Sequence, residues 1–139
     1  MGASFVGLPR RLLRLAGACL LLAAPLAHAI PESVAGDDDA AIRKLITDYR
    51  KAIQTKDLAL FKTVKQVSDD EERRIKRAFD SIKSQEVEIT VLAIDVKGDK
   101  ASVKATRRDV IDGSFVASFP QNFTMQKSTR GWSITEITR

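Results

Sequence analysis

The chain has 139 residues, with 23 basic and 18 acidic side chains, one Cys and one His. Cys19 and His28 both lie in the first 29 residues, so the rest of the chain has neither. Without Cys there is no disulfide, thiolate nucleophile or thiolate metal site. Without His there is no Ser-His-Asp triad and no usual zinc ligand set. We therefore expect neither a metal nor a cofactor.

Residues 1–29 have the pattern of a secretory signal peptide. Three arginines between positions 10 and 14 precede an apolar run over residues 15–26, and small residues occupy positions 27 and 29. The apolar run is too short to span a bilayer. We expect cleavage after Ala29, a periplasmic or secreted mature chain, and no membrane span after cleavage.

The basicity of the chain comes largely from this segment. Three of the 23 basic residues lie in it, so 20 basic and 18 acidic residues remain and the net charge falls from +5 to +2. A nucleic-acid-binding protein would carry a concentrated basic face, whereas here the two signs are mixed throughout. We expect no nucleic-acid partner.

The mature chain is long enough for one domain. Residues 30–37 lack periodicity and are expected to be a flexible lead, followed by a single domain over residues 38–139. Apolar residues recur at helical spacing between Ile42 and Ile53, which predicts a first helix. We expect this helix to begin at the acidic run of residues 37–39, because acids favour a helix N-terminus.

Two further helices are predicted. A break over residues 55–57 leads into a short helix that holds Leu58 and Phe61. Ser68 followed by Glu71 is a capping-box pattern that predicts a third helix, with a buried stripe that includes Ala78 and Phe79. Acids at positions 69, 70 and 72 lie four residues before the bases at 73, 74 and 76, which predicts a solvated helix face that pairs with itself.

A long hairpin over residues 87–110 follows. Gly98 at the first central position of a two-residue loop suits a type II′ turn. The apolar alternation slips by one residue near Val91-Leu92, which predicts a β-bulge that bends the strand. On the return strand Ala101, Val103 and Ala105 share the inward face.

Two more strands complete the predicted sheet. After a turn at residues 112–114, Phe119, Phe123 and Met125 share one face of a third strand, and Pro120 indicates that its early part is at an edge or irregular. A short strand over residues 132–137 is the last. The sequence thus predicts an α+β fold, with three N-terminal helices packed on a four-stranded antiparallel sheet.

Four segments resemble the nuclear transport factor 2-like superfamily, and more narrowly its SnoaL-like, small exported bacterial members. They are ITDYRKAI with the following KDL (residues 46–58), the helix over residues 68–79, VKGDKASV (residues 96–103) and GWSITEI (residues 131–137). The resemblance covers essentially the whole mature chain. It implies a cystatin-like cone, in which a curved sheet wraps around the first helix and often leaves a pocket at the open end.

The candidate pocket residues follow from the expected faces. Arg107 and Asp109 continue the inward parity toward the open end, either as a mutually satisfied ion pair or as an anion-binding arginine oriented by the aspartate. Tyr49, Phe61 and Trp132 either fill the core or line the pocket.

Two functions remain open, because relatives implied by the resemblance include isomerases, cyclases, dehydratases and binding modules. The preferred hypothesis is an exported, non-catalytic module that binds a small molecule or a protein partner, with a homodimer through the exposed sheet face as one option. The alternative is a small lyase or isomerase of the ketosteroid isomerase or polyketide cyclase type, with Asp109 as base and Tyr49 as donor. That enzyme needs both side chains in one open pocket.

Overall fold

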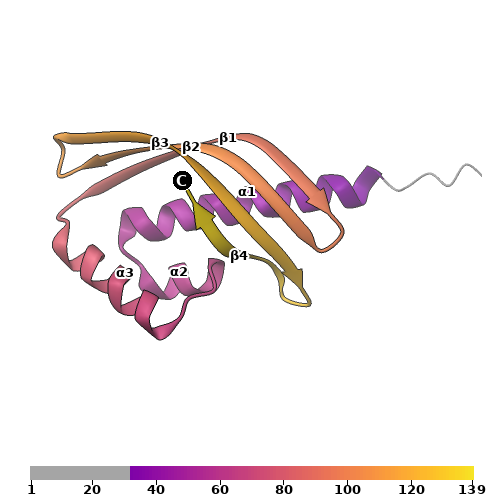
Figure 1. The fold of residues 1–139 in the computed structure, drawn as a ribbon, viewed down its shortest axis with the longest axis horizontal. Helices are drawn as coiled ribbons and strands as arrows, with labels where there is room; N and C mark the ends of the chain where they lie inside the picture. Colours follow the sequence, from indigo (N-terminus) through magenta and orange to yellow (C-terminus); the bar gives the residue numbers. More distant parts are fainter. Residues whose placement is uncertain (1–31) are drawn as a thin grey trace, which may run out of the picture.

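The computed structural model describes the backbone of residues 32–139 and the side chains from residue 36. Its order of elements is α1 (Glu32–Thr55), α2 (Leu58–Val64), α3 (Asp69–Ser81), β1 (Gln85–Lys97), β2 (Lys100–Ile111), β3 (Phe115–Ser128) and β4 (Gly131–Thr138). The strands form one antiparallel meander in the order β1-β2-β3-β4, as Figure 1 shows. The predicted fold class is confirmed. The expected signal peptide lies outside the described residues.

The start of α1 differs from the prediction. The helix begins at Glu32, five residues before Asp37, and so takes up most of the segment expected to be a flexible lead. The acidic run lies within the helix instead of capping it. Asp38 is buried there and accepts hydrogen bonds from Lys127 and Trp132, so its partners are tertiary rather than the N–H groups of a helix end.

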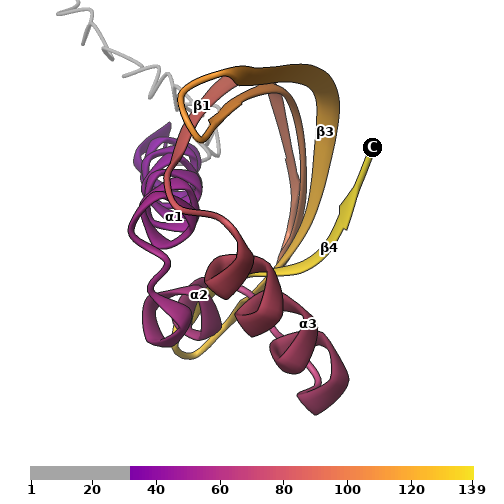
Figure 2. The same ribbon diagram turned by 90° about the vertical axis from the view of Figure 1, so that its left-hand side faces the viewer.

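The sheet curves over α1, α2 packs beside α1, and α3 follows next to α2 (Figure 2). The core lies between the inward stripe of α1 and the concave face of the sheet. Tyr49 on α1 packs edge-on against Phe123 of β3, with ring centroids 5.5 Å apart. The largest fully buried side chains are Ile42, Val103, Phe123, Met125 and Ile134.

The predicted β-bulge is present. Val91 pairs with Ala105 and Ala93 pairs with Lys104, which leaves Leu92 as the extra residue on β1. Leu92 is 66% exposed, so the bulge turns one large apolar side chain outward, while Val91 before it and Ile94 after it stay partly buried. A second register shift between β3 and β4 lies at Thr124/Met125. Bulges increase local twist and bend, and the sheet therefore closes around α1.

The turn and edge predictions are also confirmed. Gly98 has φ of +63° and Asp99 has no positive φ, as a type II′ turn requires. β3 pairs with β2 along its length but with β4 only from Asn122 to Ser128. Pro120 therefore lies in the part of β3 that forms an edge of the sheet, without a β4 partner. Its missing N–H costs no hydrogen bond of the sheet there.

Ser68 caps α3 as predicted, and Asp57 caps α2 in the same way, although only the first cap was predicted. Ser68 Oγ accepts a hydrogen bond from the Glu71 N–H at 3.3 Å, and Asp57 Oδ1 accepts one from the Leu60 N–H at 2.9 Å. Each cap satisfies one of the N–H groups that the first turn of a helix leaves unpaired.

The predicted pairing of acids and bases along α3 is wrong in detail. Glu72 binds Lys62 of α2 at 2.7 Å instead of Lys76, and Lys76 binds Asp80 at 3.1 Å. Arg73 pairs with Asp70, three residues away. The buried stripe is also narrower than predicted, since Phe79 is buried but Ala78 is exposed. Ion pairs to α2 thus help to hold α3 in place, which a pattern within one helix does not reveal.

Within residues 32–139, no helix has both the length and the hydrophobicity needed to cross a membrane.

Phe123→Ala tests the core. Phe123 is only 1% exposed, so we expect its loss to lower the free energy of unfolding by about 3–5 kcal/mol in urea denaturation. The matched control is Leu92→Ala, which removes an exposed apolar side chain and is expected to change stability by less than about 0.5 kcal/mol. Equal losses from the two substitutions would contradict this core.

Candidate functional site

Arg107 and Asp109 form a buried ion pair on the concave face of β2. Arg107 Nε donates to Asp109 Oδ1 at 2.7 Å, and Arg107 Nη2 donates to Asp109 Oδ2 at 2.8 Å. Their side chains are 11% and 8% exposed. This bidentate geometry is the strongest form of the contact, and it confirms the predicted ion pair. Gln85 Nε2 donates a further hydrogen bond to Asp109 Oδ2 at 3.1 Å.

Tyr49 joins this pair from α1. Its Oη accepts a hydrogen bond from Arg107 Nη1 at 3.2 Å, and the residue is 4% exposed. Burial raises the pKa of the Tyr49 phenol above its ordinary value of 10.0, while the Arg107 charge and the Gln121 amide oppose that rise. The phenol is therefore protonated at neutral pH, and its hydrogen remains available for donation.

Gln121 is the member of this group that the sequence did not predict. It is 4% exposed, and its Oε1 is the one buried side-chain N or O atom without a hydrogen-bond partner in the described part of the chain. The sequence did contain a signal for it. Gln121 is two residues from both Phe119 and Phe123, so it faces inward with them on β3. We call Tyr49, Arg107, Asp109 and Gln121 the cone cluster.

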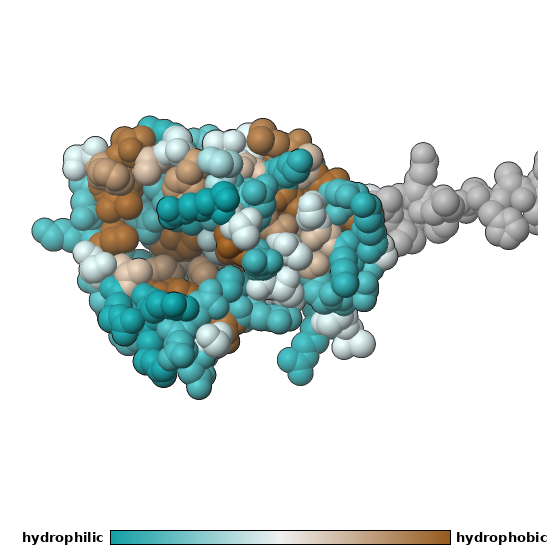
Figure 3. All heavy atoms as spheres, in the orientation of Figure 1, coloured by the Kyte–Doolittle hydropathy of each residue, from teal (hydrophilic) through white to brown (hydrophobic). Residues whose placement is uncertain are grey.

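Phe119 lies beside the cone cluster, on the part of β3 that extends past the end of β4. The Arg107 guanidinium is 5.7 Å from the Phe119 ring centroid, and the Arg139 guanidinium is 4.4 Å from it. In Figure 3 the surface is hollowed between α3 and the sheet, and apolar side chains are visible inside the hollow.

The remaining predicted residues separate into two places. Phe61 packs between Tyr49 and Phe79, with centroid distances of 5.6 and 6.2 Å, and so lies in the core next to the cone cluster. Trp132 does not reach this cluster. Its Nε1 donates to Asp38 Oδ1 at 3.0 Å, and Asp38 precedes Tyr49 by eleven residues, about 16 Å along α1.

Asp38 fixes the indole of Trp132. Its Oδ1 also accepts a hydrogen bond from Lys127 Nζ at 2.6 Å. These bonds, the one from Lys127 first and the one from Trp132 second, hold the pKa of the Asp38 carboxyl below its ordinary value of 3.8. The position of Trp132 is thus set by a structural lock between α1 and the β3–β4 hairpin.

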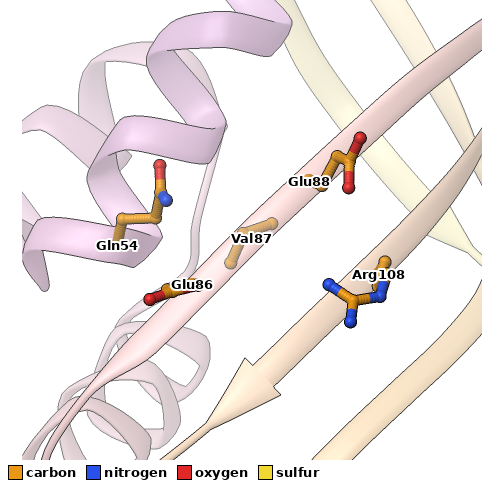
Figure 4. Close-up of a pocket in the computed structure, with 5 residues that line it drawn as sticks. All are labelled: Gln54, Glu86, Val87, Glu88 and Arg108. Carbon is orange, nitrogen blue, oxygen red and sulfur yellow. The ribbon is translucent and has the colours of Figure 1, made fainter. Parts of the chain in front are cut away.

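A separate shallow pocket of about 190 Å³ lies at the β1 edge, between the end of α1 and the first strands (Figure 4). It is lined by Gln54, Glu86, Val87, Glu88 and Arg108. Glu88 on β1 is the cross-strand neighbour of Arg108 on β2. None of the predicted site residues lines this pocket. Among the described residues, no three His, Cys, Asp or Glu side chains come together as a metal site would require.

Comparison with solved structures places this arrangement in a known fold. The chain is similar to the Kfla4162 protein of Kribbella flavida, with a TM-score of 0.68 and 16% identity over 75% of this chain and 90% of that one. It is also similar to a nuclear transport factor 2-like superfamily protein of Salmonella enterica, with a TM-score of 0.61 and 16% identity over 74% and 89% of the two chains.

A third similar structure comes from Streptomyces avermitilis and is described as a "putative dehydratase from the NTF2-like family". Its TM-score is 0.58, with 12% identity over 72% of this chain and 93% of that one. No protein-family model and no curated protein sequence matches the chain. The protein has the nuclear transport factor 2-like fold, as the sequence resemblance predicted.

Tyr49→Phe tests the electrostatics of the cone cluster. Because the pKa of Tyr49 is raised in the folded state, its phenol stabilises the fold below pH 10 and loses that contribution as the pH rises above 10. At pH 7 we expect the variant to be about 1–2 kcal/mol less stable, since it loses a hydrogen bond to a charged group. This difference should shrink above pH 10 in urea denaturation. Tyr49 is the only tyrosine, so a difference that stays constant with pH would contradict the assignment.

Proposed function

We propose that the mature chain is an exported, non-catalytic module that binds a small molecule at the cone cluster. The observation that carries this proposal is the unpartnered Oε1 of Gln121 beside Tyr49 and Arg107. An unsatisfied buried acceptor costs about 1–3 kcal/mol, and native proteins seldom retain one. A hydrogen-bond donor on a ligand would satisfy it, while the Tyr49 hydroxyl could donate to the same ligand.

The state of Asp109 favours binding over catalysis. A general base must come within hydrogen-bond distance of the proton that it removes. Both oxygens of Asp109 already accept hydrogen bonds from Arg107, and Gln85 occupies Oδ2 a second time. Arg107 donates to Tyr49 as well, which leaves the phenol hydrogen free, so it is the engaged carboxylate of Asp109 that disfavours catalysis. The likeness to structures with enzyme names is a likeness of fold, and it carries no activity over to this chain.

The polar composition of the outer face of the sheet argues against dimerisation through that face, and so favours the small-ligand form of the proposal. The outward residues of β2 and β3 are exposed and mostly polar, among them Ser102, Lys104, Thr106, Ser118, Asn122 and Thr124. Stable homodimer interfaces are richer in apolar area than this face is. Export is proposed from the pattern of residues 1–29 alone.

Native mass spectrometry of the protein from its exported fraction tests both parts of the proposal. We expect a chain that begins at Ile30 and carries a small-molecule adduct. The adduct should be lost in Gln121→Met, which keeps the length of the side chain but removes the acceptor. The matched control, Gln54→Met, alters an exposed glutamine on α1 and should keep the adduct.

The stability of Gln121→Met without ligand provides a second, independent readout. If Oε1 is unpaired, replacing it with an apolar group should raise the free energy of unfolding by about 1–3 kcal/mol. Loss of the adduct together with a gain in stability is the expected result. A loss of stability would show that an internal donor already satisfies Oε1, and a protein without any adduct would contradict small-molecule binding.

A further inference from the structure

A basic pocket of about 280 Å³ lies between the end of α2 and the β3–β4 hairpin, and none of the cone-cluster residues lines it. Its charged lining residues are Lys62, Lys65 and Arg130, and no carboxylate lines it. The two glutamates that pair with the lysines belong to α3 and are not part of the lining. We call this site the hairpin pocket.

Lys65 is a preorganised cation in this pocket. Its side chain is 8% exposed, and its Nζ donates to Glu71 Oε1 at 2.6 Å and to the Gln66 carbonyl at 3.0 Å. The backbone is fixed as well, because Lys65 forms a parallel bridge with Ile134 of β4. An ammonium has three N–H donors, so one remains after these two bonds among the described residues.

The other two cations are more accessible. Lys62 is 47% exposed and is positioned by Glu72 at 2.7 Å. Arg130 is exposed at the hairpin turn and takes part in no ion pair within the described part of the chain. With two glutamates set against three cations, the site keeps a net charge of about +1.

The neutral lining shapes the pocket, and the donors left for a ligand belong to the cations. The hydroxyls of Ser128, Ser133 and Thr63 already donate to backbone carbonyl groups, and the indole of Trp132 completes the lining. The Trp132 N–H is engaged by Asp38, so the indole is fixed in place. Three cations that line one pocket match an oxyanion with several acceptor oxygens.

From these contacts we infer that the hairpin pocket binds a phosphate group. A phosphate offers more acceptor oxygens to the three cations than a carboxylate does, and its larger negative charge is attracted more strongly to them. This inference is independent of the small-molecule site at the cone cluster, since the two share no residue.

Fluorescence titration of the full chain with inorganic phosphate tests the inference. Trp132 is the only tryptophan and lines the pocket, so its emission reports on occupancy directly. We expect a saturable change, with a dissociation constant in the millimolar range, against sodium chloride at matched ionic strength. Lys62→Ala combined with Arg130→Ala should weaken binding by about tenfold or more.

The matched control combines Lys104→Ala with Arg108→Ala, which removes the same charge from the outer face of β2 and should leave phosphate binding unchanged. An equal loss in this control would show that only net charge matters, and would overturn the inference. So would a lack of saturation, or saturation by acetate with the same affinity.

Discussion

The structure depends on one constraint, which is that the sheet must bend far enough to cover α1. The inward stripe of α1 includes Ile42 and Tyr49 and can be buried only by a concave surface. The extra residue Leu92 in β1 and the register shift between β3 and β4 supply the bend. Because that bend turns the inward face of β2 toward the helix, Arg107 meets Tyr49 across the interior.

The buried ion pair determines how the cone cluster can be studied. Removing one member of a buried pair costs about 3–5 kcal/mol, because the other charge is left without a partner. An experiment with Arg107→Ala would therefore not distinguish the loss of a ligand contact from the loss of the fold. Gln121 is neutral and has an unpaired acceptor, so function and stability are expected to respond to its substitution in opposite directions. This contrast makes Gln121 the informative residue of the cluster.

Several features of the fold and site could be predicted because strand faces repeat every two residues. The phase slip located the bulge at Leu92, and parity placed Arg107 beside Asp109. Gln121 lies on the same inward face of its strand. Its amide is neutral, however, so nothing in the sequence indicated that it lies beside a charged group. Trp132 fills the core, one of its two predicted roles, but the sequence did not identify Asp38 as the partner of its N–H. The partner of Glu72 was predicted wrongly, because Lys62 lies on another helix. Contacts between distant segments leave no periodic signal in the sequence.

The lock at Asp38 has a consequence for the order of folding. Asp38 binds Lys127 and Trp132, which lie 89 and 94 residues further along the chain. Contacts with such large separation in sequence slow folding, because the intervening chain must be ordered before they can form. The contacts of α1 with the β3–β4 hairpin therefore form only after that hairpin has been made. Until β4 emerges, the apolar stripe of α1 lacks part of its cover and is a natural target for chaperones.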